Sequence, residues 1–330
     1  MRVVITGGAG FIGRRLALRL LEVNALTDSA GREQPIERIV LFDRAAPDPR
    51  LLHDPRVEAV IGDIGDPEQV TAVIAPDTGA VFHMAAVVSA GAEEDFDLGM
   101  TVNLQGTMNV LAAARRLPSP ARLVFASSVA VYGGMIPETI PDALMLNPQT
   151  SYGTQKAIGE LLVQDYARKG YVDGRALRFP TIVVRPGKPN KAASTWASSI
   201  IREPLRGEEA VCPVEPDQAM YVLSPRKLVD TALKAAAMPA EDWGPARMLA
   251  LPGLTVTVRE MLAALASVAG ARVAARVRFE PDPFIQQIVN GWATHFDPAR
   301  GRALGFETDS SFEEIVHIFI EDELGGNFAA

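Results

Sequence analysis

The sequence contains one cysteine and no long apolar run. A single cysteine, Cys212, excludes an internal disulfide and is typical of a protein kept in a reducing compartment. No histidine lies near Cys212 in the sequence, so we interpret it as a small buried hydrophobe. No stretch of about 18 consecutive apolar residues occurs, so no membrane span is predicted. The first residues enter a strand at once, which predicts no secretion signal and a cytoplasmic location.

Positive charge and histidine are also scarce. The formal net charge is −8, and no basic run is longer than two residues such as Arg115-Arg116. Nucleic acid is therefore not an expected partner. The four histidines show no metal-ligand spacing, so no metal site is predicted.

The first half of the chain alternates short β-branched runs with helical stretches. Strands are predicted at 3–6, 39–43, 57–61, 80–83, 123–127 and 175–179, and helices at 12–22, 67–74, 100–116 and 151–168. Asp66 is the expected N-cap of the second helix. Such alternation predicts an α/β fold, a Rossmann-type doubly wound parallel sheet covered by helices on both faces.

Beyond Pro186 this rhythm changes. The spacing predicts helices at 225–238, 257–268 and 312–323, the second opened by a capping box of Thr257 and Glu260, and a strand at 272–279. We therefore expect a dinucleotide-binding domain over 1–186, with a return segment near 219–250, and a smaller α+β substrate domain over 187–330. A cleft between them is the expected substrate site. The polar segment 24–37 is interpreted as a surface insertion.

A glycine-rich loop follows the first strand and opens the first helix. Gly7 permits the sharp turn, Gly10 lets the backbone approach a pyrophosphate, and Gly13 lets helix pack on strand. The unpaired N–H groups of the helix start, at Phe11 and Ile12, favour an anion there. The alternative is a strand-helix turn that binds nothing.

Two later strand ends carry carboxylates suited to the rest of a dinucleotide. Asp43 can accept hydrogen bonds from the adenosine ribose and would repel a 2′-phosphate, which favours NAD over NADP. Arg44 follows directly and could bind a 2′-phosphate, which would favour NADP. Asp63 and Ile64 follow the third strand and are candidates for the adenine edge.

Tyr152 and Lys156 stand four residues apart on a predicted helix, so their side chains share one face. An ammonium beside a phenol stabilises the phenolate and lowers the pKa of the tyrosine. Such a tyrosine can exchange a proton with an alcohol or a ketone. Taken alone, the same spacing also occurs by chance in many helices.

These motifs together resemble the extended short-chain dehydrogenases/reductases, which include nucleotide-sugar epimerases and dehydratases. The resemblance rests on the glycine loop, on Ser127-Ser128-Val129-Ala130-Val131-Tyr132-Gly133 and on the Tyr152–Lys156 pair. It implies that Tyr152 is the acid/base, that Lys156 lowers its pKa and holds the nicotinamide ribose, and that Ser128 holds the substrate oxygen. Ser127 is the fallback for Ser128, and it is also an expected cofactor contact. The resemblance further implies that Ala85, Ala86 and Asn103 line or brace the cofactor site.

The departures from that family concern the substrate. Many nucleotide-sugar enzymes carry asparagine where this chain has Thr181, and an arginine and a histidine in the stretch that corresponds to 219–224. Without these groups a nucleoside diphosphate is disfavoured, and a small sugar acid is expected. Arg185 is a candidate for its carboxylate, and Ser89, Ser128 and Asn190 for its other polar groups. The alternative for Arg185 is one half of an interdomain ion pair.

The resemblance is most specific in the stretches 95–100, 185–190 and 201–205, and it implies NAD-dependent oxidation of the 2-hydroxyl of a small sugar acid, above all D-erythronate to 2-keto-D-erythronate. Two alternatives stay open: an NAD-dependent nucleotide-sugar epimerase or dehydratase, and a non-catalytic dinucleotide-sensing regulator. The family further implies a homodimer through helices 100–116 and 151–168.

Overall fold

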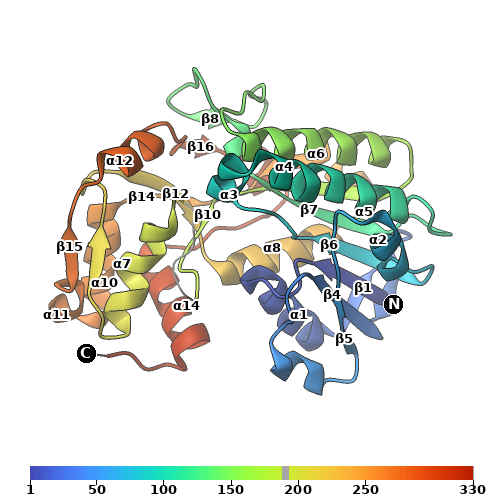
Figure 1. The fold of residues 1–330 in the computed structure, drawn as a ribbon, viewed down its shortest axis with the longest axis horizontal. Coiled ribbons are helices and arrows are strands. Elements are labelled where there is room, and N and C mark those ends of the chain that lie inside the picture. Colours follow the sequence, from blue (N-terminus) through green and yellow to red (C-terminus); the bar gives the residue numbers. More distant parts are fainter. Residues whose placement is uncertain (188–192, 330) are drawn as a thin grey trace. The chain divides into compact units, whose positions relative to one another are not determined.

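The computed structural model describes residues 1–187 and 193–329, and this part of the chain forms two compact units (Figure 1). Unit 1 contains residues 1–131, 148–178 and 229–250, whereas unit 2 contains 132–147, 179–228 and 251–330. Within the described residues, no helix is both long and apolar enough to cross a membrane.

Unit 1 is built on a seven-stranded sheet in the order β13-β9-β7-β6-β1-β4-β5. Its strands are β1 (Arg2–Thr6), β4 (Arg38–Asp43), β5 (Val57–Ile61), β6 (Thr78–His83), β7 (Arg122–Ser128), β9 (Asp173–Phe179) and β13 (Met248–Ala250). The pairings β5–β4, β4–β1, β1–β6, β6–β7 and β9–β13 are all parallel. Parallel strands buried on both faces read as near-continuous apolar runs, as Val3, Val4 and Ile5 do here.

Helices cover the sheet of unit 1. They are α1 (Phe11–Val23), α2 (Pro67–Val73), α3 (Ser89–Glu94), α4 (Phe96–Gly99), α5 (Gly106–Ala114), α6 (Ser151–Arg168) and α9 (Ala240–Trp243), with 3-10 turns at Pro49–His53 and Val129–Val131. Helix α8 (Pro225–Ala237) begins in unit 2, and its residues from Val229 onward belong to unit 1. One apolar core joins the sheet to α2, α5 and α6 through Val73, Val110 and Val163. Figure 1 shows α5 and α6 running beside each other over this layer.

The polar segment 24–37 forms a hairpin of β2 (Ala25–Thr27) and β3 (Glu33–Pro35). Asp28 shapes its turn because the carboxylate accepts hydrogen bonds from the backbone N–H groups of Ala30 and Arg32, each at 2.9 Å.

Unit 2 combines small sheets with a helical layer. Its strands are β8 (Ile140–Pro141), β10 (Thr181–Ile182), β11 (Ala210–Cys212), β12 (Ala219–Leu223), β14 (Leu254–Thr257), β15 (Val277–Phe279) and β16 (Phe296–Asp297). Its helices are α7 (Thr195–Leu205), α10 (Val258–Ala269), α11 (Ala271–Ala274), α12 (Pro283–Asn290), α13 (Ala299–Ala303) and α14 (Phe312–Leu324). Helices α7, α10 and α14 pack around a separate core that contains Ile200, Leu265 and Phe319. The mixed composition of this unit agrees with the expected α+β character.

Two predicted elements differ in the structure. The predicted helix 100–116 begins as a π-helical stretch, Met100–Gln105, and becomes α-helical only as α5. The predicted strand 272–279 is wrong in its first half, where Ala271–Ala274 forms α11 and only Val277–Phe279 is a strand. Gly270 (φ 94°) ends α10, and the alanine-rich segment that follows favours another helical turn over extended backbone.

Candidate active site

The glycine loop packs tightly against the end of β6. Gly7 has φ 73°, and a Cβ on it would lie 2.8 Å from the backbone nitrogen of Ala85, so no side chain fits there. A Cβ on Gly13 would lie 2.3 Å from the carbonyl oxygen of Gly7, which explains why α1 can begin so close to β1. Gly10 is the N-cap of α1 and has no side chain to cover the N–H groups of the first turn. These features fit the pyrophosphate of a dinucleotide.

Asp43 lies at the end of β4, beside this loop. Its Oδ2 accepts a hydrogen bond from the N–H of Ala9 at 3.1 Å, and its Oδ1 accepts one from Ala45 at 3.1 Å. The loop therefore holds the carboxylate in one orientation at the edge of the sheet. This position fits the predicted contact with the adenosine ribose.

Asp63 and Ile64 form a turn after β5. Asp63 Oδ1 accepts a hydrogen bond from the Gly65 N–H at 2.8 Å, and the Asp63 N–H donates to Gln69 at 2.9 Å. The Asp63 carboxylate lies 4.0 Å from the Arg44 guanidinium, a partly exposed ion pair. Ile64 is buried. Both residues thus occupy defined positions at the carboxyl ends of the strands.

His83 is a buried residue to which sequence reasoning assigned no role. Its Nδ1 lies 2.7 Å from Thr6 Oγ1, and its Nε2 lies 2.9 Å from Thr107 Oγ1. The Thr107 hydroxyl donates its one proton to the carbonyl of Asn103, so it accepts from His83, and Nε2 carries the ring proton. Thr6 in turn accepts a hydrogen bond from the N–H of Ala85. This chain fixes the backbone of Ala85 beside the glycine loop.

Asn103 links three segments of the same region. Its Oδ1 accepts a hydrogen bond from the Val87 N–H at 2.8 Å, and its Nδ2 donates to the Val87 carbonyl and to Gln155 Oε1. The side chain therefore ties the segment that passes through Ala85 and Ala86 to α6. Its predicted contact with the cofactor remains a prediction.

Ser128, Tyr152 and Lys156 come together where β7 ends against α6. The Ser128 hydroxyl lies close enough to the Tyr152 phenol to lower the pKa of the phenol, and it accepts a hydrogen bond from the Ala130 N–H at 3.1 Å. Thr150 caps α6 by accepting a hydrogen bond from Gly153, and a Cβ on Gly153 would lie 2.2 Å from the Ala130 carbonyl. Glycine at 153 thus lets the first turn of α6 reach the strand end.

The proton affinities of this pair differ from the sequence expectation. Burial raises the pKa of Tyr152 to about 12, against a smaller lowering by Ser128. The Lys156 Nζ donates to the Ala126 carbonyl at 2.7 Å and lies 5.6 Å from the centre of the Tyr152 ring. Burial lowers the pKa of Lys156 to about 7, and the charge of Glu160 opposes that shift. In this arrangement, burial of the phenol outweighs any stabilisation of the phenolate by the lysine.

Glu160 and Arg178 form a buried ion pair behind these residues, and sequence reasoning missed it. Their closest approach is 2.7 Å, and Glu160 also accepts a hydrogen bond from Ser127 Oγ at 2.5 Å. The available signal was the position of Glu160 one helical turn after Lys156. Ser127 is therefore engaged with Glu160, whereas Ser128 is engaged with Tyr152.

The candidate substrate residues Arg185, Ser89 and Asn190 differ in what the structure shows of their surroundings. Arg185, in unit 2, donates to Ser194 Oγ at 2.8 Å, and among the described residues it has no carboxylate partner. Burial and the nearby charge of Arg202 lower the pKa of Arg185 to about 10. Ser89 is half-buried at the start of α3. Asn190 lies outside the described residues.

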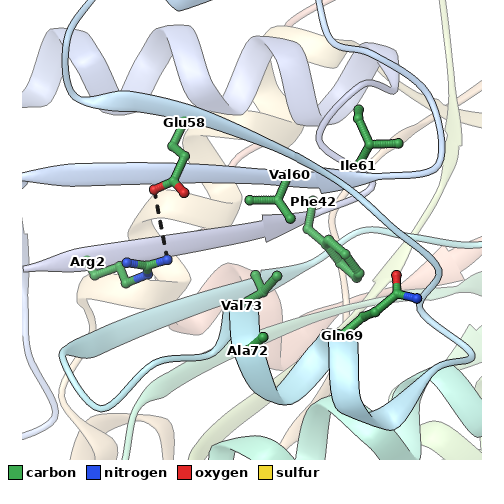
Figure 2. A pocket seen from close by; sticks show the side chains of 8 residues that line it. All are labelled: Arg2, Phe42, Glu58, Val60, Ile61, Gln69, Ala72 and Val73. Atoms are coloured by element: carbon green, nitrogen blue, oxygen red, sulfur yellow. Dashed lines mark ion pairs between the residues drawn. The ribbon is translucent and has the colours of Figure 1, made fainter.

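A cavity of about 410 Å³ opens at the β5 edge of the sheet (Figure 2). Phe42, Val60 and Val73 line its apolar wall, and the Arg2–Glu58 ion pair, at 4.0 Å, lies at one end. None of the described residues that line it is a predicted site residue.

A dinucleotide loop, an oriented carboxylate and a serine-tyrosine-lysine group at one edge of a parallel sheet define a dinucleotide-dependent oxidoreductase. Residues 3–241 match the model of the NAD dependent epimerase/dehydratase family, and the chain belongs to this family. The predicted fold class, family resemblance and cofactor, NAD, are thereby confirmed.

Full-length relatives agree with this assignment. The chain is 50% identical to D-erythronate dehydrogenase of Cupriavidus necator over 322 residues, which is 98% of each chain. It is 43% identical to D-erythronate dehydrogenase of Haemophilus influenzae, covering 98% of this chain and 100% of that one. A solved structure, described as a nucleoside-diphosphate-sugar epimerase from Agrobacterium tumefaciens, superposes with a TM-score of 0.93 at 43% identity, covering 99% of this chain and 95% of that chain.

The burial of His83 predicts a specific pH dependence of stability. Burial lowers the pKa of His83 to about 3, from an unfolded value of 6.5. The contribution of neutral His83 to the free energy of unfolding is therefore complete above pH 6.5. It is lost as the pH falls toward 3, by at most about 1.4 kcal/mol per pH unit. The free energy of unfolding can be measured in urea at pH 7.5, 6.0 and 5.0 for the natural protein and for His83→Gln. The amount by which the natural protein exceeds the variant should shrink steadily as the pH falls. A constant difference across this range would show that His83 does not resist protonation.

Proposed function

We propose that this protein oxidises the 2-hydroxyl of D-erythronate to give 2-keto-D-erythronate, with NAD⁺ as the oxidant. The carrying observation is the convergence of Ser128, Tyr152 and Lys156 beside a glycine loop. The two D-erythronate dehydrogenases that match along nearly their full length support this substrate.

The roles of the three residues follow from their contacts. Tyr152, as the phenolate, takes the proton from the substrate hydroxyl, and Ser128, which lies beside Tyr152, orients the same oxygen. The ammonium of Lys156 stabilises this phenolate before it takes the proton. NAD⁺, held by the glycine loop and Asp43, supplies the hydride acceptor. The contact between Ser127 and Glu160 favours Ser128 over Ser127 for this role.

A nucleotide-sugar epimerase is the second candidate, and the name of the solved structure at 43% identity favours it. In an epimerase the reduced cofactor is reoxidised within each cycle, so NADH does not accumulate. Against it stands the segment at 219–224, which holds neither arginine nor histidine and runs through the buried strand β12.

The decisive experiment is an NADH-appearance assay with four- to six-carbon aldonic acids and with nucleotide sugars. We expect stoichiometric NADH with D-erythronate. Tyr152→Phe should reduce the rate by about 100-fold or more, since general acid-base catalysis contributes about 10²–10⁴-fold. Tyr166→Phe makes the same chemical change further along α6, so it is the matched control and should retain the rate. Full turnover by Tyr152→Phe would rule out this mechanism.

We propose further that Arg185 binds the substrate carboxylate. Its guanidinium is half-buried, it contacts a serine hydroxyl, and no carboxylate among the described residues neutralises it. A planar guanidinium can grip a carboxylate with two parallel hydrogen bonds. The repulsion from Arg202 gives an anionic substrate an additional favourable interaction at this position.

Arg185→Gln should therefore weaken substrate binding more than it affects folding. Losing a charge-assisted hydrogen bond costs about 1.5–3 kcal/mol, so kcat/KM for D-erythronate should fall by about 10- to 100-fold, mainly through KM. Arg206→Gln, at the exposed C-cap of helix α7, is the matched control. Steady-state kinetics decide the matter, and equal effects of both substitutions would remove Arg185 from the binding site.

We also propose that the protein works in the cytoplasm as a homodimer through α5 and α6. The single cysteine supports the reducing compartment. Apolar side chains stay exposed on these adjacent helices, namely Met108 at 43%, Ile158 at 36% and Leu161 at 61%. Exposed apolar side chains clustered on neighbouring helices are typical of an interaction surface.

Leu161→Glu should shift the protein to monomers, because each copy would bury a charge at the shared face. Light scattering after size exclusion measures this, with Leu52→Glu as the control at a side chain of 44% exposure on a 3-10 turn. A protein that is monomeric before substitution would refute the proposed dimer.

A further inference from the structure

Glu160 is the most completely bonded carboxylate behind the catalytic residues. It lies one helical turn after Lys156 on α6 and is 0% exposed. Its Oε1 accepts hydrogen bonds from Ser127 Oγ at 2.5 Å and from Arg178 Nε at 2.9 Å, and its Oε2 accepts one from the Arg178 guanidinium at 2.7 Å. The carboxylate is therefore held from β7 and from β9 at once.

A contribution to folding stability does not explain why Glu160 and Arg178 form a buried ion pair. Burying two charges costs several kcal/mol per ion in desolvation, and apolar side chains of the same volume often stabilise a core as well or better. Glu160 and Arg178 are both almost fully buried in unit 1, whose apolar core contains Phe125 and Val163. The pair is better explained by what it does to its neighbours.

Its neighbours are the reacting groups. Three consecutive residues at the end of β7 contact α6: Ala126 accepts a hydrogen bond from Lys156 Nζ, Ser127 donates one to Glu160, and Ser128 lies beside Tyr152. Holding Ser127 therefore fixes the carbonyl before it and the hydroxyl after it. Glu160 on α6 thus fixes the position of the end of β7, where the catalytic residues of α6 make their contacts.

The charge of Glu160 also acts on Lys156 directly. Desolvation of the buried ammonium lowers the pKa of Lys156 to about 7, and Glu160 is the group that raises it. Three other titratable groups face Lys156 or Glu160: Tyr152 on α6 itself, His83 on β6, which is neutral at ordinary pH, and Arg178 on β9, which pairs with Glu160. Glu93 on α3 accepts a hydrogen bond from the backbone of Ser151 at the start of the helix.

We propose that Glu160, oriented by Arg178, is a positioning residue that keeps Lys156 in its ammonium form and holds the Ser127-Ser128 strand end against Tyr152. This role rests on the proposed oxidoreductase function. Its electrostatic part is a property of the protein alone and can be measured without substrate.

The test is the titration of Lys156 in the free protein. The chain has six lysines, so in a ¹³C-lysine-labelled sample the Lys156 signal can be assigned as the one that disappears in Lys156→Met. Glu160→Gln keeps the shape of the side chain and removes its charge, so the titration midpoint of Lys156 should fall by about one pH unit or more. Asp165→Asn makes the same chemical change on an exposed part of α6 and should leave the midpoint in place.

A second variant separates charge from packing. Glu160→Gln combined with Arg178→Gln removes both charges, so the Lys156 midpoint should lie between those of the natural protein and Glu160→Gln. If Glu160→Gln does not fold, Glu160→Asp retains the charge and should keep the midpoint near its natural value. An unchanged midpoint in folded Glu160→Gln, a full-unit fall in Glu160→Asp, or an equal fall in Asp165→Asn would overturn the proposal.

Activity provides the second readout. In Glu160→Gln the alkaline limb of the kcat profile should move to lower pH together with the Lys156 midpoint, while KM for D-erythronate changes little. If the Lys156 midpoint shifts but the natural protein forms no NADH from any acid tested, the proposed function fails. The role of Glu160 in keeping Lys156 protonated then stands. If NADH forms from D-erythronate but the Lys156 midpoint does not shift, the proposed function stands and the proposed role of Glu160 fails.

Discussion

Parallel hydrogen bonding between β4, β1, β6 and β7 is the constraint on which the rest of unit 1 depends. In-register pairing places Thr6 beside both Phe42 and His83, so the residues that follow these positions emerge at one edge of the sheet. The glycine loop, Asp43, Ala85 and Ser128 reach a common region only because all their strands run the same way. A single antiparallel strand among them would move its contribution to the opposite edge.

Buried polar side chains then fix what the sheet brings together. His83, Asn103 and Glu160 are each almost fully buried, and each joins at least two segments. A buried polar group left without partners would be costly, so each network admits few alternative arrangements. The region where the cofactor and substrate are expected is therefore held by side chains that need not touch either one.

Local signals in the sequence predicted much of this architecture. Asp66 caps α2 as expected, and Thr257 with Glu260 forms the predicted capping box of α10. These features depend on residues three or four positions apart, which is why they can be read without a fold. The π-helical start of 100–116 and the helical turn at Ala271–Ala274 depend on packing and on small differences in propensity, and the apolar pattern does not distinguish them.

The sequence by itself determined the order of the motifs and the chemistry of the groups: a glycine loop suited to a pyrophosphate, a strand-end carboxylate suited to a ribose, and a serine, tyrosine and lysine with the spacing expected of a proton-transfer site. Only the tertiary structure decided how these groups act on one another. Ser127 and Ser128 are equivalent as sequence, but in the structure Ser127 donates to Glu160, whereas Ser128 lies beside Tyr152, two helical turns earlier on α6. The protonation of Lys156 likewise depends on its burial, which arises only when β7 and α6 pack together, and on the charge of Glu160 one helical turn away.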